Sequence, residues 1–255
     1  MNDQLQQTDA AVEREFLHPS KRRPHYLERV SIVQAIRELR HRVKPGLMLD
    51  VGCGMKPYES LLTQRDSRYY GTDWPVTMEG SYGGSTRADF FSDSMVLPFP
   101  EGTFDTIVST QVLEHVRQPE IVIREMARIL KPNGILILSA PMTWPLHEEP
   151  HDYYRYTLHG LRHLLEEADF EILDEIPRGN NWTTMAQMFL DTQVGNLGRR
   201  LPEKIYTSLV SLAVNQACSV ANFFKPVHRL CLGWVITARK TSAGEVPTAD
   251  VRHSL

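Results

Sequence analysis

The chain has 255 residues, of which 42% are hydrophobic, so it is long enough for one domain with additions and can bury a sizeable core. Its formal net charge of -3 gives no electrostatic attraction to phosphate, which argues against nucleic acid as a partner. Cys53, Cys218 and Cys231 have neither metal-binding nor disulfide spacing, and the polar N-terminus lacks the apolar segment of a signal peptide. We therefore expect a cytoplasmic protein.

The first half of the chain predicts strands alternating with helices. After an N-terminal region, 1–45, with a helix at 26–42, strands are expected at 47–51, 68–74, 85–91 and 103–110 and helices at 56–64 and 118–130. This alternation is typical of an α/β fold, in which helices cover both faces of a mostly parallel sheet.

The second half continues the pattern and then interrupts it. A strand at 134–141, a helix at 157–170 and a strand at 171–177 would complete a core over 46–177. Residues 178–229 are expected to form a helical insertion of two helices, and 230–241 to contain the last strand of the core. The tail, 242–255, is expected to be disordered.

Twenty uncharged residues, 205–224, lie within the insertion and are long enough to span a bilayer. Ser208, Ser211, Asn215, Ser219 and Asn222 recur in them at helical spacing and form a polar stripe, which a lipid-exposed span should not carry. A buried or partner-facing helix is therefore favoured, and weak contact with a membrane surface and dimerisation through 205–224 stay open.

The segment LDVGCG, 49–54, places a glycine-rich corner after the first predicted strand. Gly52 and Gly54 can adopt positive φ and allow a ligand to approach the backbone. The third glycine of a dinucleotide fingerprint is replaced by Pro57, and no phosphate-binding loop is present. The corner therefore does not predict a pyrophosphate ligand.

Two acids near this corner define the ligand more closely. Asp50, at the end of the first strand, would repel a phosphate but suits a cationic ligand, unless it only caps the turn. Asp73, which ends the second strand, can accept hydrogen bonds from both ribose hydroxyls, unless it is a solvated turn residue. A ribose and a positive charge without a pyrophosphate describe S-adenosylmethionine.

Over residues 46–177 the sequence resembles the class I S-adenosylmethionine-dependent methyltransferases, of the type 11-like group. The resemblance is carried by LDVGCG, GTDW, LPFPEGTFDTIVSTQVLEHV and REMARILKPNGILILSAP, which occur in the family's order. It implies a Rossmann-like sheet of seven strands, with the last strand antiparallel and inserted beside the sixth.

The resemblance also implies roles for individual residues in binding S-adenosylmethionine. Asp50, Gly52, Cys53 and Gly54 would surround its methionine end, Asp73 its ribose, and Trp74 its adenine. Either Asp93 or Asp89 would contact the adenine amino group, with the spacing favouring Asp93, and Thr110, Gln111 and His115 would complete the pocket.

The segment after the fifth strand, 145–157, concentrates histidines, acids and tyrosines where ligands enter such a sheet. His151 is the first candidate for a general base, with His147, Asp152 and Tyr153 as further catalytic candidates. A capped turn is the structural alternative. We expect no metal, because magnesium, the metal that some sugar methyltransferases use, is poorly matched by histidine.

The sequence thus predicts methyl transfer to a small molecule, most simply to a hydroxyl of a sugar, lipid-linked or secondary metabolite. The N-terminal helix and the insertion would cover the acceptor, and their uncharged helices suggest an apolar or bulky one. A protein methyltransferase and a non-catalytic cofactor-binding subunit remain alternatives.

Overall fold

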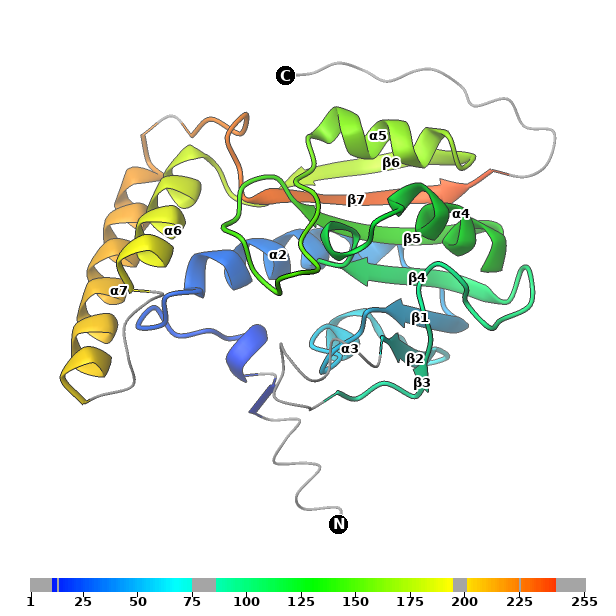
Figure 1. Ribbon diagram of the computed structural model, residues 1–255, viewed down its shortest axis with the longest axis horizontal. Coiled ribbons are helices and arrows are strands. Elements are labelled where there is room, and N and C mark those ends of the chain that lie inside the picture. The colour runs from blue at the N-terminus through cyan, green and yellow to red at the C-terminus, as the bar shows by residue number, and fades with distance from the viewer. Residues whose placement is uncertain (1–10, 13, 75–85, 195–200, 225, 242–255) are drawn as a thin grey trace, which may run out of the picture.

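The computed structural model describes residues 11–12, 14–74, 86–194, 201–224 and 226–241, and the tail predicted to be disordered lies outside them. Seven strands form one sheet in the order β3-β2-β1-β4-β5-β7-β6 (Figure 1). Their bounds are Leu47–Val51 (β1), Arg68–Asp73 (β2), Phe90–Phe91 (β3), Phe104–Thr110 (β4), Leu130–Pro141 (β5), Phe170–Pro177 (β6) and Gly233–Lys240 (β7). Only β7 runs antiparallel to its neighbours, β5 and β6, which confirms the predicted fold class.

Helices flank this sheet and extend beyond one end of it (Figure 1). They include α2 (Tyr26–Leu39), α3 (Glu59–Leu62), α4 (Pro119–Ile129), α5 (Leu158–Glu166), α6 (Asn181–Val194) and α7 (Leu201–Ala221), with 3-10 turns η1 (Arg40–Arg42) and η3 (Leu113–His115). The helix predicted at 56–64 is much shorter, because Lys56 adopts a φ of 53° that no right-handed helix accommodates.

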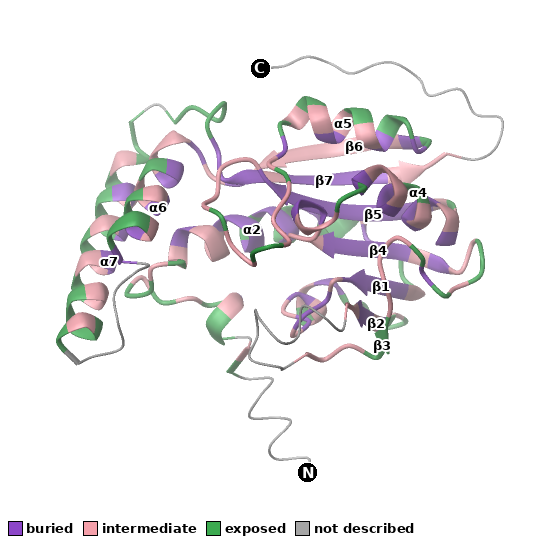
Figure 2. Cartoon of the chain, viewed as in Figure 1, coloured by how far each residue is buried: buried purple, intermediate pink, exposed green. Residues whose placement is uncertain are grey.

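Alternating side chains of the strands build a separate core on each face of the sheet. Leu49 of β1 packs in the cluster that contains Ile123 and Met126 of α4, while its neighbour Met48 packs with Ile32 and Ile36 of α2. Figure 2 shows the central strands buried between these layers. The sheet is therefore rigid where its strand ends carry the candidate site.

The two helices predicted between the sixth and last strands are present as α6 and α7. Ser211 and Asn215 on the polar stripe of α7 are fully buried, and the Asn215 amide donates to the backbone oxygen of Lys21 at 2.8 Å. The polar stripe thus faces the N-terminal segment, and the apolar face is turned outward. The division of the chain into the five regions proposed from the sequence stays a prediction.

Candidate functional site

A cavity of about 690 Å³ lies at the carboxyl ends of β1, β2 and β4. The strand order reverses between β1 and β4, which is where an open α/β sheet binds its ligands. Gly52 follows β1, Asp73 and Trp74 lie at the end of β2, and Gln111 follows β4, and all four line the cavity. Its volume suits a small organic ligand.

The glycine corner has the conformation expected from the sequence. Gly52 and Gly54 have φ values of 72° and 48°. A Cβ at Gly52 would lie 2.3 Å from Cγ2 of Val112, so no larger residue fits between β1 and the segment after β4. Gly52 lines the cavity, whereas Gly54 and the buried Cys53 are not among the described residues that do.

Asp73 joins the ends of β1 and β2. Its Oδ2 accepts a hydrogen bond from the Gly54 amide at 3.0 Å, and its Oδ1 accepts one from the Trp74 amide at 2.9 Å. These contacts hold the carboxylate at the cavity wall. The position agrees with the predicted ribose contact, which itself stays a prediction.

Asp50 lies behind the corner and is not among the described residues that line the cavity. It is only 1% exposed, its Oδ2 accepts a hydrogen bond from the Tyr69 hydroxyl at 2.7 Å, and its Oδ1 has no hydrogen-bond partner in the described part of the chain. Burial raises the pKa of this carboxyl to about 7, although the Tyr69 hydrogen bond lowers it.

This raised pKa predicts how stability varies with pH. Between about pH 4 and pH 7 the unfolded chain ionises Asp50 while the folded chain keeps it protonated, so rising pH lowers the free energy of unfolding. Asp50→Asn removes this titration. Between about pH 4 and pH 7 its free energy of unfolding should therefore fall less than that of the wild type, and the two falls should differ by more than about 1 kcal/mol. Urea unfolding of both proteins without ligand would measure the difference, and identical pH slopes would contradict it.

The two acids considered for adenine recognition have different surroundings. Asp89 accepts hydrogen bonds from Nζ of Lys56 at 2.5 Å and from the Gly71 amide at 2.7 Å, and it is not among the described lining residues. Asp93 lines the cavity, and its Oδ1 accepts a hydrogen bond from the Met95 amide at 2.9 Å. This arrangement favours Asp93.

The loop between β5 and α5, residues 142–157, forms the opposite wall of the cavity. Its backbone is fixed to η3, because the Tyr153 amide donates to the Glu114 oxygen at 2.7 Å and the Tyr156 hydroxyl donates to the Leu113 oxygen at 2.9 Å. Among the residues of this loop, Glu148, His151 and Tyr153 line the cavity.

His151 is the predicted catalytic histidine that lines the cavity. Its Nδ1 lies 3.1 Å from the Tyr153 hydroxyl, and its ring meets Trp74 edge-on with centroids 5.3 Å apart. Nε of Arg117 donates to the same hydroxyl at 2.9 Å. The Tyr153 hydroxyl oxygen can also accept a hydrogen bond from Nδ1–H of His151. In the tautomer that makes this hydrogen bond, the proton is on Nδ1 and Nε2 keeps a lone pair.

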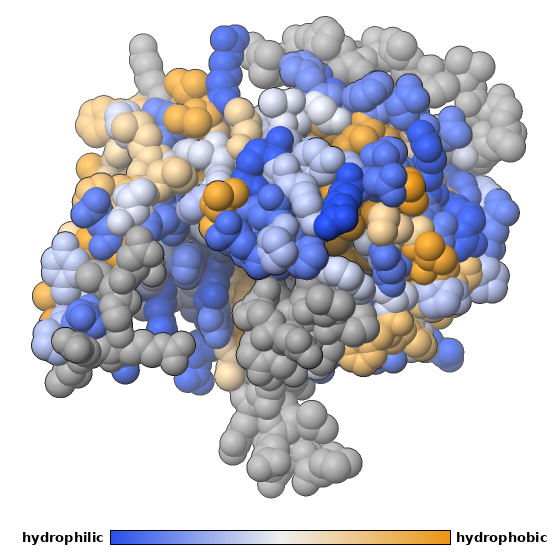
Figure 3. Space-filling view, viewed as in Figure 1, coloured by the Kyte–Doolittle hydropathy of each residue, from blue (hydrophilic) through white to orange (hydrophobic). Residues whose placement is uncertain are grey.

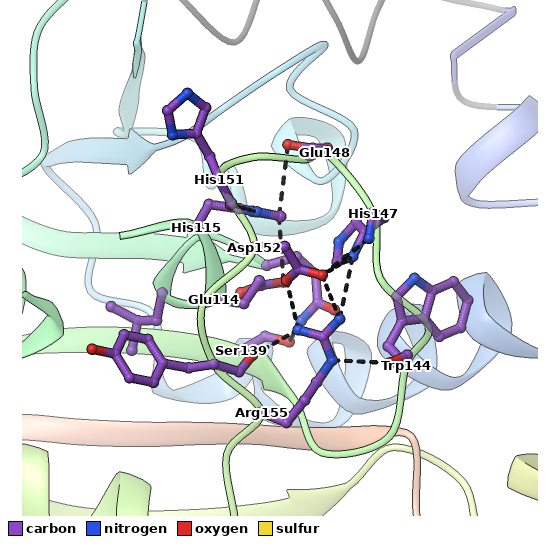
Figure 4. Close-up of polar contacts among 12 residues, drawn as sticks. Glu114, His115, Ser139, Trp144, His147, Glu148, His151, Asp152 and Arg155 are labelled. Atoms are coloured by element: carbon purple, nitrogen blue, oxygen red, sulfur yellow. Dashed lines mark hydrogen bonds and ion pairs between the residues drawn. The ribbon is translucent and has the colours of Figure 1, made fainter. Parts of the chain in front are cut away.

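His147 and Asp152 lie behind this wall (Figure 4). The side chain of Asp152 is 1% exposed and accepts hydrogen bonds from Nη1 and Nη2 of Arg155 at 2.6 and 2.7 Å. Burial would raise its pKa, but the Arg155 and His147 contacts bring it to about 2, which makes Asp152 a poor base. Burial, and then His115, lower the pKa of His147, so its ring is neutral near pH 7.

Two buried charged residues escaped the sequence analysis. Glu114 and Arg178 are 0% and 1% exposed, and burial raises the pKa of Glu114 to about 8. Arg178 donates to Glu28 of α2 and to Gln111 at the cavity. No signal marked them, because Glu114 reads as a helix-turn acid in LEHV and Arg178 as a loop residue after a strand.

The lining residues fit the predicted cofactor. Carboxylates at Asp73 and Asp93 accept hydrogen bonds from hydroxyl and amino groups, Trp74 offers an aromatic surface, and Gly52 exposes backbone. Thr110, Gln111 and His115, also predicted, line the same cavity. The cavity thus combines the groups that a nucleoside ligand requires.

Comparison with known proteins agrees with this fit. The family model described as "Methyltransferase domain" matches residues 22–175. A "Probable S-adenosylmethionine-dependent methyltransferase" of Mycolicibacterium smegmatis is 29% identical over 146 residues, 54% of this chain and 57% of that one. A sterol 24-C-methyltransferase of Gibberella zeae is 33% identical over 103 residues, 36% of this chain and 27% of that one. The chain therefore spans less than two thirds of these relatives' lengths.

Among solved structures, that of the cyclase SpnF has a TM-score of 0.53 at 24% identity, with 82% of each chain covered. This likeness supports the fold alone. The match of the family model to most of the chain decides the family and confirms the resemblance, with S-adenosylmethionine as its cofactor. The protein thus belongs to the family of methyltransferase domains.

Proposed function

We propose that this protein methylates a hydroxyl of a small-molecule acceptor. One observation carries the proposal: His151 and Tyr153 lie on the wall of the cavity opposite the ends of β1 and β2, so the proposed cofactor-binding residues and the proposed base line the same space. S-adenosylmethionine, when bound, supplies an electrophilic methyl group.

The residues of the chain would then have separate tasks. Gly52, Asp73, Trp74 and Asp93 would hold the cofactor from the strand ends. His151 would take the proton of the acceptor hydroxyl at Nε2, and Tyr153 would keep its ring in position through the contact at Nδ1. Positioning of the acceptor accounts for the remaining rate enhancement.

Asp73→Ala should weaken binding of S-adenosylmethionine and of its demethylated product by about 2 kcal/mol, or roughly thirtyfold. The reason is that the ribose hydroxyls could no longer donate their proposed hydrogen bonds to this carboxylate. Isothermal titration calorimetry would measure both affinities. Asp66→Ala is the matched control, since Asp66 is an exposed acid before the opposite end of β2. Equal affinities of Asp73→Ala and the wild type would overturn the ribose assignment, and binding without methyl transfer would favour the non-catalytic alternative.

We also propose that α7 brings the protein to an anionic membrane surface. Its outward face carries apolar residues, with exposed fractions of 53% for Ile205, 58% for Leu209 and 60% for Val220, and Phe224, just after the helix, is 66% exposed. Phe223 is 87% exposed at the end of the helix. Figure 3 shows apolar residues gathered at the upper end of the helix pair, with more polar residues below them. Such a face favours contact with an apolar phase.

The positive charge of the insertion favours an anionic membrane, and not a second copy of the chain, as the partner of α7. Without the buried and paired Arg178, residues 179–229 contain five Lys and Arg and two Asp and Glu, a net charge of +3, while the whole chain carries -3. Two such faces would repel each other, whereas an anionic bilayer attracts them. None of the helices in the described ranges has the length and apolarity needed to cross a membrane.

Replacing Phe223 and Phe224 with serine should reduce binding to vesicles of phosphatidylglycerol by roughly tenfold or more, because two exposed aromatic side chains could no longer insert into the bilayer. Cosedimentation would measure this, with phosphatidylcholine vesicles for comparison. Phe91→Ser, which alters an exposed phenylalanine of β3, should bind like the wild type. Absence of vesicle binding, or a dimer that the serine variant abolishes, would contradict the proposal.

The proposed membrane contact bears on the acceptor class, and the cysteines bear on the compartment. A bulky or apolar acceptor, such as a lipid-linked one, would meet the cavity from the membrane side. Cys53, Cys218 and Cys231 are free and buried, which supports the cytoplasm as the proposed compartment.

A further inference from the structure

We infer that Glu114, His115 and His147 form a binding site for a divalent transition-metal ion in the wall of the cavity. One ligand atom from each of these residues lies within 4.8 Å of the other two. The residues come from η3 and from the β5–α5 loop, which the fold brings together (Figure 4). The inference departs from the sequence analysis, in which no metal was expected.

Glu114 supplies the observation that calls for a cation. It is fully buried, and neither Oε1 nor Oε2 has a hydrogen-bond partner in the described part of the chain. Its Oε1 points toward His115, 3.9 Å from Nε2. Buried carboxylates are normally paired, and the nearby Arg155 and Arg178 bind Asp152 and Glu28 instead.

Both histidines are oriented as metal ligands usually are. Nδ1 of His115 lies 2.7 Å from the backbone oxygen of His151, which can only accept, so Nδ1 carries the proton and Nε2 keeps its lone pair. Nδ1 of His147 lies 3.2 Å from the oxygen of Pro145 and 3.3 Å from Oδ2 of Asp152, two acceptors that are closer to it than the Arg155 Nη2 donor at 3.5 Å, so these contacts favour a proton on Nδ1. Its Nε2 is left with a lone pair in the same way.

The donor set defines the class of ion. Two imidazole nitrogens with a carboxylate match Zn²⁺ or Co²⁺ better than Mg²⁺, which prefers oxygen and water. Oε2 of Glu148 lies 3.6 Å from Nε2 of His115, beside the three proposed ligands. Because His115 and Glu148 also line the cavity, an open coordination position would face the acceptor. An acceptor oxygen could occupy it.

Metal binding can be measured without S-adenosylmethionine. Tag-free full-length protein, first dialysed against a chelator, is titrated with Co²⁺ while visible absorption is recorded, and with Zn²⁺ and Mg²⁺ by calorimetry. We expect one Co²⁺ and one Zn²⁺ per chain, d–d absorption bands typical of nitrogen and oxygen ligands, and at least tenfold weaker binding of Mg²⁺. Failure to bind Co²⁺ or Zn²⁺ stoichiometrically would overturn the inference.

Substitutions locate the site. Glu114→Gln and His147→Ala should each weaken Co²⁺ binding at least tenfold, whereas His159→Ala, at an exposed histidine of α5, should bind like the wild type. If Glu114→Gln does not fold, His147→Ala is the deciding variant. The side chain of His147 is 29% exposed, so its removal should disturb folding less than a change at the fully buried Glu114. Equal binding by His147→Ala and wild type would refute the site. Failure here leaves the proposed methyl transfer untouched, because cofactor affinity is titrated separately.

Discussion

His151→Ala is expected to lower the turnover of methyl transfer about 100-fold or more while changing the affinity for S-adenosylmethionine less than about threefold. A positioned general base contributes this much to proton removal, and His151 is the predicted base that lines the cavity. Single-turnover kinetics would isolate the chemical step, and calorimetry would give the affinity.

Two further variants separate catalysis from packing. Tyr153→Phe removes the hydroxyl beside Nδ1 and should slow turnover less, because the imidazole stays in place without its orienting contact. His159→Ala changes an exposed histidine outside the cavity and should leave turnover unchanged. Normal turnover in His151→Ala would show that the base lies elsewhere or that the acceptor needs none.

The fold could be predicted from the sequence because its signals are local. Apolar strands alternate with amphipathic helices, and corners such as Gly52 and Gly54 need conformations that few residues adopt. Parallel strands place their carboxyl ends on one edge, so Asp73 and either Asp93 or Asp89 could be expected near one another, and Asp73 and Asp93 do line one cavity.

The loop after β5 shows where such prediction ends. Its composition indicated a functional segment, but which side chain faces the cavity depends on contacts with η3, remote in sequence. His151 lines the cavity, whereas Asp152 next to it is buried against Arg155. Adjacent residues of a loop have no fixed periodicity from which their directions could be derived.

The helix α7 shows a different limit. Polar residues at helical spacing normally mark the solvent side, yet here Ser211 and Asn215 are buried and Leu209 is exposed. The reason is that the partners of this polar face are backbone groups: the Asn215 amide donates to the backbone oxygens of Lys21 and Arg23. Backbone groups as partners cannot be identified from residue types.

Arg178→Ala should lower the free energy of unfolding by about 3 kcal/mol, because it leaves a buried ion pair with one partner. The Arg178 side chain is 1% exposed, and its guanidinium donates to Glu28 at 2.6 Å and to Gln111 at 2.5 Å. It thereby ties the segment after β6 to α2 and to the end of β4. Urea unfolding monitored by circular dichroism would measure the loss.

A comparison with Arg42→Ala distinguishes a buried pair from a surface pair. Arg42 pairs with Asp174 at 2.8 Å, but its side chain is 38% exposed, so this change should cost only about 1 kcal/mol or less. Adding Glu28→Gln to Arg178→Ala should restore part of the stability, because no unpaired carboxylate then remains. An Arg178→Ala loss no larger than that of Arg42→Ala would contradict this account.

Arg178→Ala should also affect the cavity, because Arg178 donates a hydrogen bond to Gln111. This residue has a φ of 57°, which is strained for a side chain other than glycine, and its Oε1 accepts from Arg178 while its Nε2 donates to Ser139 at 2.8 Å. Without Arg178 the strained conformation loses one of its two side-chain contacts, and Gln111 lines the cavity. Arg178→Ala should therefore weaken S-adenosylmethionine binding several-fold even under conditions in which it remains folded, whereas Arg42→Ala should not.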